Sequence, residues 1–422
     1  MLGAMQDWDL RVSLLIDHAA REFGDREIVT RWNGGSESRT TWAGVRRDAL
    51  RMVQALRRLG IQPGDRVATL AMNHGPHLVA WYGVTGAGAV LHTINPRLFD
   101  DPLEYIANHA EDRVLIYDAI FQPIVDRMRP QWTTIEHYIC FDSADHAPLF
   151  ADWIGAEDGD THWTPGNERD PCMLCYTSGT TGHPKGVLFE HRSNMLHTYA
   201  AIMPQCLNLD ARSAVLPVVP MFHANNWGFP WAAAAVGAKL GYCTNNEAAN
   251  LLALIRKEGL NYVAGVPTVW LSLFQHVEAH GEEFPPITNA LTGGSAMPAA
   301  MVEKLMKRGI RIAHAWGMTE TSPISTIAYE SPDWDTLDLD QKVAIKAKQG
   351  KALFGVELRT VDLDNPARVL PRDGVSAGAL QVRGPWVIRR YFKAEQDAAS
   401  PVTEDGGQWF DTGAQGAAFA GL

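Results

Sequence analysis

The strongest constraint on the fold is a repeated order of segments, in which an apolar stripe at helical spacing ends at a glycine. This order occurs in HLVAWYGVTGAGAV (77–90). It occurs again in LLALIRKEGLNYVAGVP (251–267) and MVEKLMKRGIRIAHAW (301–316), where a β-like run follows the glycine. Alternating helices and strands pack as a sheet covered by helices, so the sequence predicts an α/β fold. The 422 residues allow about three domain-sized units or one large composite domain.

The pattern changes near Gly350. Short β-like runs, FGVELRTVD (354–362) and GALQVRG (378–384), are separated by the turn-forming DNPARVLPRDG (364–374). Such runs predict a small antiparallel β unit, and a charged, helix-like stretch near 334–347 precedes it.

Charge and hydropathy narrow the class of protein. A net charge of -11 without a run of Lys or Arg argues against a nucleic-acid partner, because phosphate backbones recruit a basic face. The longest uncharged apolar run, GFPWAAAAVGA (228–238), is too short for a bilayer that needs about 20 residues. The amino-terminal segment lacks the continuous apolar core of a secretion signal. We therefore expect a cytoplasmic protein with no transmembrane segment.

The cysteines agree with a reducing compartment, because the five of them are scattered along the chain. Cys172 and Cys175 form a C-x-x-C pattern, which also occurs in zinc and redox sites. No second closely spaced pair completes a zinc site. The pair lies in PCMLCYTSG, an apolar run interpreted as a strand, where this spacing places the two side chains on opposite faces. Packing in the core is the favoured interpretation.

A loop with the sequence YTSGTTGHPKG (176–186) combines three glycines, four hydroxyl side chains and one cation, Lys185. Glycines allow the backbone to approach a ligand closely, and hydroxyls donate hydrogen bonds, so polyphosphate is the first candidate ligand. The loop differs from the phosphate loop of nucleotide hydrolases, because Pro184 stands where that motif has a glycine before its lysine. Ser, Thr and Gly also dominate ordinary turns, which is the alternative interpretation.

Five motifs follow one another along the chain: YTSGTTGHPKG (176–186), MFHANNWG (221–228), TGGSAMP (292–298), AWGMTETSP (315–323) and WFDTG (409–413). In order and number they resemble the motifs of the acyl-adenylate-forming (AMP-binding) enzymes, in the branch of fatty-acid and related acyl-CoA ligases. HTINPRLF (92–99) with MFHANNWG is similar to the medium-chain fatty-acid ligases and the 3-methylmercaptopropionate CoA ligases.

The resemblance implies a large adenylation N-terminal domain of the acyl-CoA synthetase type. Such a domain has two α/β subdomains and a small β-barrel-like subdomain. Here it would span residues 1–413, with residues 350–413 as the small β subdomain.

The resemblance also implies a reaction, in which a carboxylate attacks ATP to form an acyl-adenylate and CoA then takes the acyl group. Mg²⁺ is the implied cofactor, with Glu320 and Thr177 as its ligands, since hard oxygen ligands suit this ion. Lys185, Thr319 and Glu320 are the implied catalytic residues. The residues implied to bind ATP are Thr177, Ser178, Gly179, Thr180, Thr181, Lys185, Trp227, Gly294, Ser295, His314, Ala315, Trp316, Gly317 and Thr319.

The acyl substrate is implied to lie against a second, overlapping group of residues. These are His223, Ala224, Asn225, Trp227, Gly294 and Met318. A lone histidine in an apolar run is commonly a hydrogen-bonded core residue, so His223 is a candidate only through the resemblance. The alanine-rich segment that follows either leaves room for an alkyl chain or packs tightly.

The carboxyl-terminal end departs from the family pattern. Ala414 follows WFDTG where the family has an aspartate that binds the ribose hydroxyls, and alanine offers no side-chain acceptor. Residues 414–422 are therefore expected to be an aberrant tail, and the family's mobile C-terminal domain is expected to be absent. Activity would then be impaired, and a surface left uncovered would favour a homodimer.

Three classes of function remain open from the sequence. The first is an acyl-CoA ligase acting on a fatty or related acid. The second is a non-catalytic nucleotide- or acyl-binding protein, or a half-enzyme that needs a separate partner. The third, a luciferase-like oxygenase or a peptide-synthetase adenylation domain, is disfavoured, because no acidic residue that would select an amino acid is evident.

Overall fold

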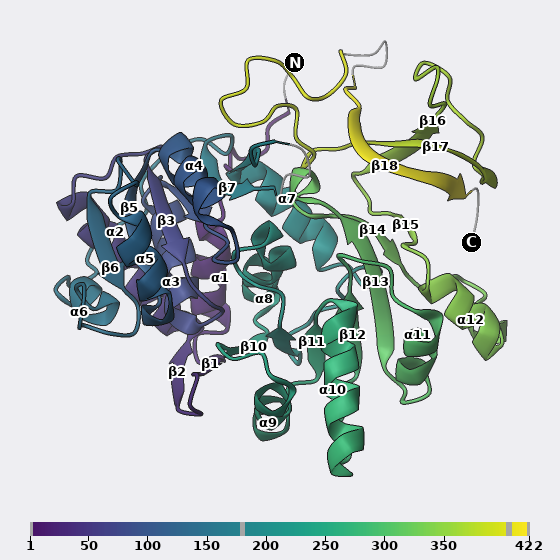
Figure 1. Ribbon diagram of the computed structural model, residues 1–422, viewed down its shortest axis with the longest axis horizontal. Helices are drawn as coiled ribbons and strands as arrows, with labels where there is room; N and C mark the ends of the chain where they lie inside the picture. The colour runs from purple at the N-terminus through teal and green to yellow at the C-terminus, as the bar shows by residue number, and fades with distance from the viewer. Residues whose placement is uncertain (1–2, 178–181, 402–406, 420–422) are drawn as a thin grey trace.

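The computed structural model describes residues 3–177, 182–401 and 407–419. Its strands form a six-stranded sheet, a nine-stranded sheet and a small three-stranded sheet (Figure 1). The predicted α/β fold is confirmed, and so is the small antiparallel unit near the carboxyl end.

The six-stranded sheet has the order β6-β5-β3-β4-β7-β8 and is parallel except for β8. Parallel neighbours need a crossover, which the intervening helices provide. The strands are β3 (Arg66–Leu70), β4 (Val90–Thr93), β5 (Asp112–Tyr117), β6 (His137–Cys140), β7 (Pro171–Tyr176) and β8 (Gly186–Glu190). The helices in this part are α2 (Trp42–Arg58), α3 (Gly75–Gly86), α4 (Asp100–Ala110), α5 (Gln122–Met128), α6 (Phe150–Gly155) and α7 (His191–Ala201), with a 3₁₀ turn η1 (Ala119–Phe121).

The nine-stranded sheet has the order β15-β14-β13-β12-β11-β9-β10-β1-β2, with antiparallel pairs at both edges. Its strands are β1 (Glu27–Arg31), β2 (Glu37–Thr41), β9 (Ala214–Pro217), β10 (Lys239–Cys243), β11 (Tyr262–Ala264), β12 (Asn289–Thr292), β13 (Arg311–Gly317), β14 (Ile324–Ala328) and β15 (Lys351–Ala352). Its helices are α1 (Ser13–Glu22), α8 (Phe229–Val236), α9 (Ala248–Glu258), α10 (Pro267–His280), α11 (Ala299–Met306) and α12 (Leu339–Lys346), with 3₁₀ turns η2 (Ala224–Gly228), η3 (Thr319–Thr321) and η4 (Trp334–Thr336).

Alternation along the strands creates separate hydrophobic layers. In β3, Val67 belongs to the main core with α2, α3 and α8, whereas its neighbour Ala68 packs with α4 and α5. In β9, Val215 faces the main core and Leu216 packs with α9 and α10. Successive strand residues point to opposite faces, so each large sheet is covered on both sides and the main core lies between the sheets.

The segments that the sequence analysis singled out take the expected structures. Residues 77–90 cover most of α3 and the start of β4, residues 251–267 cover most of α9 and all of β11, and residues 301–316 cover most of α11 and β13. The helix-like stretch near 334–347 contains η4 and α12. The alanine-rich segment forms α8, where Ala232, Ala233 and Ala234 are fully buried in the main core. Tight packing is therefore the better explanation of these alanines.

The small sheet has the order β16-β17-β18 and is antiparallel. Its strands are β16 (Glu357–Val361), β17 (Asp373–Arg383) and β18 (Phe410–Phe419). Figure 1 shows this sheet above β14 and β15. The segment 414–419, predicted to begin an aberrant tail, continues strand β18 directly from the last motif.

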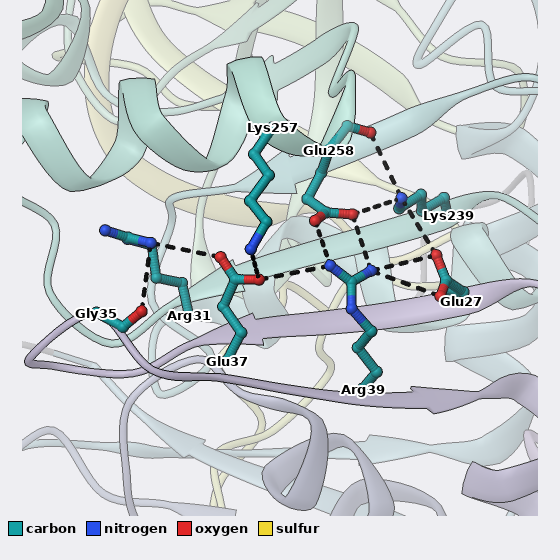
Figure 2. Close-up of polar contacts among 8 residues, drawn as sticks. All are labelled: Glu27, Arg31, Gly35, Glu37, Arg39, Lys239, Lys257 and Glu258. Atoms are coloured by element: carbon teal, nitrogen blue, oxygen red, sulfur yellow. Dashed lines mark hydrogen bonds and ion pairs between the residues drawn. The ribbon is translucent and has the colours of Figure 1, made fainter.

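A network of charged side chains ties the edge hairpin β1–β2 to α9 and β10 (Figure 2). Arg39 lies at its centre, with Nη1 3.0 Å from Oε2 of Glu258. Lys239 Nζ lies 2.8 Å from the same carboxylate oxygen. The hydrogen bond from Arg39 lowers the pKa of Glu258 to about 2. The members are Glu27, Arg31, Glu37, Arg39, Lys239, Lys257 and Glu258.

Candidate nucleotide and acyl site

A cleft of about 430 Å³ lies where several strands of the two large sheets end. The loops that follow β7, β9, β12 and β13 all contribute to its lining, which places it at the carboxyl ends of parallel strands, the usual ligand-binding edge of such sheets. The lining residues are Thr177, His183, Lys185, His223, Ala224, Trp227, Gly293, Gly294, Ala315, Trp316, Gly317, Met318, Thr319, Glu320, Pro323, Ile324, Tyr391 and Thr412.

The two ends of the glycine- and hydroxyl-rich loop meet at this cleft. Thr177 N donates to Lys185 O over 2.9 Å, and Lys185 N donates to the Thr177 hydroxyl over 3.3 Å. These bonds close the loop at its base and place Thr177 and Lys185 side by side. The predicted phosphate-binding residues Ser178, Gly179, Thr180 and Thr181 lie outside the described residues.

Glu320 brings a carboxylate into the cleft from η3, directly after β13. The residue is 6% exposed, and Tyr391 Oη donates to its Oε1 over 2.8 Å. Its backbone oxygen accepts a hydrogen bond from Ile388 N over 2.9 Å. Burying a carboxylate costs free energy unless hydrogen bonds compensate, and the tyrosine hydroxyl provides one such bond.

The donors in the cleft fit Mg²⁺. Glu320 offers carboxylate oxygens and Thr177 a hydroxyl on the same lining. In the described part of the chain, no group of three or more His, Cys, Asp or Glu side chains would hold a metal ion. Mg²⁺ is commonly bound through one or two carboxylates together with substrate phosphates and water, so a full protein cage is not required.

The end of β13 and the loop after β12 line one side of the cleft, and part of this lining is backbone. Gly294 has φ +76°, and a Cβ at Gly293 would lie 3.0 Å from Ala315 O. Glycine at 293 therefore lets the loop approach β13 closely, and glycine at 294 adopts the positive φ without strain. Trp316 adds a flat aromatic side chain to the same lining, and Met318 and Thr319 follow it.

The 221–228 segment has an unusual backbone. Ala224, Asn225, Asn226 and Trp227 all have φ between 41° and 56°, a region that non-glycine residues avoid at a cost of about 1–2 kcal/mol each. Asn73 anchors the approach to this segment, donating from Nδ2 to Val219 O over 2.7 Å and accepting from Met221 N over 2.6 Å. The strained segment places Ala224 and Trp227 in the cleft, beside His223. Burial lowers the pKa of His223.

Among the predicted residues that the structure describes, three do not line the cleft. Asn225 is fully buried, and its Oδ1 accepts a hydrogen bond from the Cys175 thiol over 3.4 Å. His314 is fully buried, and its Nδ1 lies 3.2 Å from Lys346 O. Ser295 is exposed on the loop after β12.

The cleft also contains residues that the sequence analysis missed. Gly293, Pro323 and Thr412 lie within or beside the recognised motifs, so their neighbours in the chain were a signal. Tyr391 carried no such signal, because RRYFKA matches none of the five motifs and lies 71 residues from Glu320. The remaining missed residues are His183 and Ile324.

The C-x-x-C pair belongs to the core, as expected. Cys172 and Cys175 on β7 are 0% and 2% exposed. Burial raises the pKa of Cys172 to about 12 and that of Cys175 to about 11. Thiols with such values stay protonated at neutral pH and react poorly.

No helix in the described part of the chain has the length and apolarity needed to cross a membrane.

Comparison with known proteins shows which family the chain belongs to. The family model described as AMP-binding enzyme matches residues 16–392. The 3-methylmercaptopropionyl-CoA ligase of Ruegeria pomeroyi is 41% identical, over 98% of this chain and 77% of that protein. The medium-chain-fatty-acid–CoA ligase of Ectopseudomonas oleovorans is also 41% identical, over 98% of this chain and 76% of that protein.

Solved structures agree on the fold. The N-terminal domain of FACL13 from Mycobacterium tuberculosis superposes with a TM-score of 0.82 at 24% identity, over 96% of each chain. The match covers nearly all of a separately solved N-terminal domain, so the architecture here is that of an adenylation N-terminal domain. With the family model and the 41% identical ligases, it shows that the chain belongs to the AMP-binding enzyme family, among its acyl-CoA ligases.

Proposed function

We propose that this chain activates a carboxylic acid with ATP in the cleft and transfers the acyl group to CoA. The observation that carries the proposal is the convergence of Thr177, Lys185 and Glu320 on one cleft lining. The first step joins two anions, a carboxylate and the α-phosphate of ATP, so charge must be countered and the reactants aligned. These three side chains supply one cation and two kinds of oxygen donor for that purpose.

Each lining residue has a role in this proposal. Lys185 is exposed at the cleft and contacts the β- and γ-phosphates with its ammonium group. Glu320 and Thr177 would hold Mg²⁺, and the bound ion would supply positive charge to the phosphate oxygens. Thr319 contacts the α-phosphate, and Trp316 packs against adenine. The loop residues 178–181 contribute amides and hydroxyls to the phosphates, which stays a prediction.

The acyl substrate is proposed to be a fatty or related carboxylic acid. The names of the 41% identical relatives, a 3-methylmercaptopropionyl-CoA ligase and a medium-chain-fatty-acid–CoA ligase, support this class. In the cleft, His223, Ala224, Trp227 and Met318 form the part of the lining proposed to face the acid.

Residues 1–422 on their own are proposed to bind ATP and the acid but to turn over weakly. Ala414 supports this proposal, because its side chain cannot accept hydrogen bonds from the ribose hydroxyls. The alternative, a non-catalytic nucleotide- or acyl-binding protein or a half-enzyme that needs a separate partner, also rests on this departure from the family pattern.

Calorimetry of ATP binding in the presence of Mg²⁺ tests the proposal, combined with assays of pyrophosphate release and CoA thioester formation. The acids are 3-methylmercaptopropionate and fatty acids of short, medium and long chain. Saturable ATP binding with acid-dependent pyrophosphate release is expected. Absence of ATP binding would refute the proposed function, and ATP binding without any pyrophosphate release would favour the binding protein.

Cytoplasmic location and homodimer formation stay predictions. Light scattering on the purified chain measures its mass and decides between monomer and dimer.

A further inference from the structure

One cleft residue outside the recognised motifs contacts two charged side chains, one proposed to bind the phosphates of ATP and the other proposed to bind Mg²⁺. Tyr391 Oη donates to Oε1 of Glu320 over 2.8 Å. Lys185 Nζ lies 5.0 Å from the centroid of the Tyr391 ring, within the range of a cation–π contact. Tyr391 also lines the cleft itself. The anion and the cation thus share one aromatic residue as their partner.

Hydrogen bonds between residues 386–392 and two other loops fix the position of Tyr391. Phe392 N donates to Gly186 O over 2.8 Å, which attaches the segment to the loop that carries Lys185. Ile388 N donates to Glu320 O over 2.9 Å, and Ser322 Oγ donates to Trp386 O over 2.8 Å, which attach the segment to the loop that carries Glu320. Residues 386–392 therefore connect the two motif loops through backbone atoms.

A lysine and a buried glutamate on one cleft lining favour a direct ion pair, since opposite charges attract strongly where water is limited. Such a pair would occupy both groups and would have to break before Mg²⁺ and ATP could bind. Among the ion pairs of the described residues, none joins Lys185 to Glu320. Tyr391 offers the carboxylate a hydroxyl and the ammonium a ring face, which satisfies both groups separately.

We infer that Tyr391 is a positioning residue that keeps Lys185 and Glu320 apart and oriented for ATP with Mg²⁺. This inference rests on the proposed function. The hydroxyl orients the Glu320 carboxylate for the metal, and the ring orients Lys185 for the phosphates.

Two substitutions separate the two contacts. Tyr391→Phe removes the hydroxyl and keeps the ring, and it is expected to weaken ATP binding about three- to tenfold with Mg²⁺ present while leaving binding in excess chelator nearly unchanged. Tyr391→Leu removes both contacts and is expected to weaken ATP binding under both conditions. Tyr138→Phe is the matched control, because Tyr138 on β6 also has a cation above its ring, Arg129 at 4.3 Å, and does not line the cleft.

A double-mutant cycle by calorimetry decides whether Tyr391 acts through Glu320. In the Glu320→Ala background, which leaves no side-chain oxygen to accept from the Tyr391 hydroxyl, Tyr391→Phe is expected to have no further effect on ATP affinity. Equal affinities of wild type and Tyr391→Phe with Mg²⁺ would overturn the inference alone, as would additive losses in the cycle. Failure of the wild type to bind ATP would overturn the proposed function and the inference with it. Circular dichroism melting of each variant, including Tyr138→Phe, checks that the fold is intact.

Discussion

Replacing Glu258 with glutamine is expected to loosen the edge hairpin β1–β2 at neutral pH. Glu258 is the anion that holds Arg39 of the hairpin and Lys239 of β10 together, and its side chain is 5% exposed (Figure 2). The hydrogen bond from Arg39 lowers the pKa of Glu258 from 4.5 to about 2. The folded state therefore stabilises the charged form of Glu258 more than the unfolded state does.

The size of the effect follows from this lowering. At about 1.4 kcal/mol for each pKa unit, a lowering from 4.5 to about 2 corresponds to at most about 3.5 kcal/mol. The Arg39 side chain is 40% exposed, and water screens its charge, so about 1–2 kcal/mol is a better expectation. Because the pKa is lowered on folding, the stabilisation is fully present above pH 4.5 and is lost as the pH falls toward 2.

Hydrogen–deuterium exchange of peptides covering residues 27–41 measures the local opening of the hairpin. At pH 7, Glu258→Gln is expected to speed exchange there about five- to thirtyfold relative to wild type. The difference is expected to shrink between pH 4 and pH 3. Glu303→Gln is the control, because Glu303 pairs with Lys307 on an exposed helix face and contributes little. Unchanged exchange at pH 7, or a difference that is as large at pH 3 as at pH 7, would refute the reasoning.

Three further predictions concern the cleft and its surroundings. Lys185→Ala is expected to weaken ATP binding by about 1–3 kcal/mol and to leave AMP binding unchanged, because AMP lacks the β- and γ-phosphates; equal losses for both nucleotides in calorimetry would contradict this. Asn73→Ala is expected to destabilise the protein by about 2–3 kcal/mol, seen as a lower melting temperature, since it leaves the backbone groups of Val219 and Met221 without their partner; an unchanged melting temperature would argue against its anchoring role. Cys172 and Cys175 are expected to resist a thiol reagent in the folded protein and to react after denaturation, because burial raises the pKa of each; rapid labelling of the folded protein would contradict their burial.

Much of the fold could be predicted because local signals and tertiary structure agree. The glycines at residues 88, 259 and 309 all have positive φ, and each separates a helix from a strand. These glycines therefore mark the helix ends in the sequence. The sheet order could not be predicted in this way. β1 pairs with β10 across more than 200 residues, and no local pattern encodes that partnership.

The cleft was predictable where motifs follow strand ends. Lys185, Trp316 and Glu320 follow or end β7 and β13, and the carboxyl ends of these strands meet at the cleft. Neighbours within a motif were less predictable, because position along the chain does not specify direction. His314 turns toward α12 rather than the cleft, and Asn225 lies in a backbone conformation that propensities do not anticipate.

The contact between Tyr391 and Glu320 could not be predicted from the motifs. This contact depends on backbone bonds from residues 388 and 392 to two distant loops. Only the folded arrangement reveals that these three segments meet.

The central claim is that ATP occupies the cleft between Lys185 and Glu320. A crystal structure of the protein with ATP and Mg²⁺ tests it most directly. We predict adenine against Trp316, the β- and γ-phosphates beside Lys185, and the metal bound to Glu320. Nucleotide bound elsewhere on the protein, or an empty cleft at saturating ATP, would contradict the account.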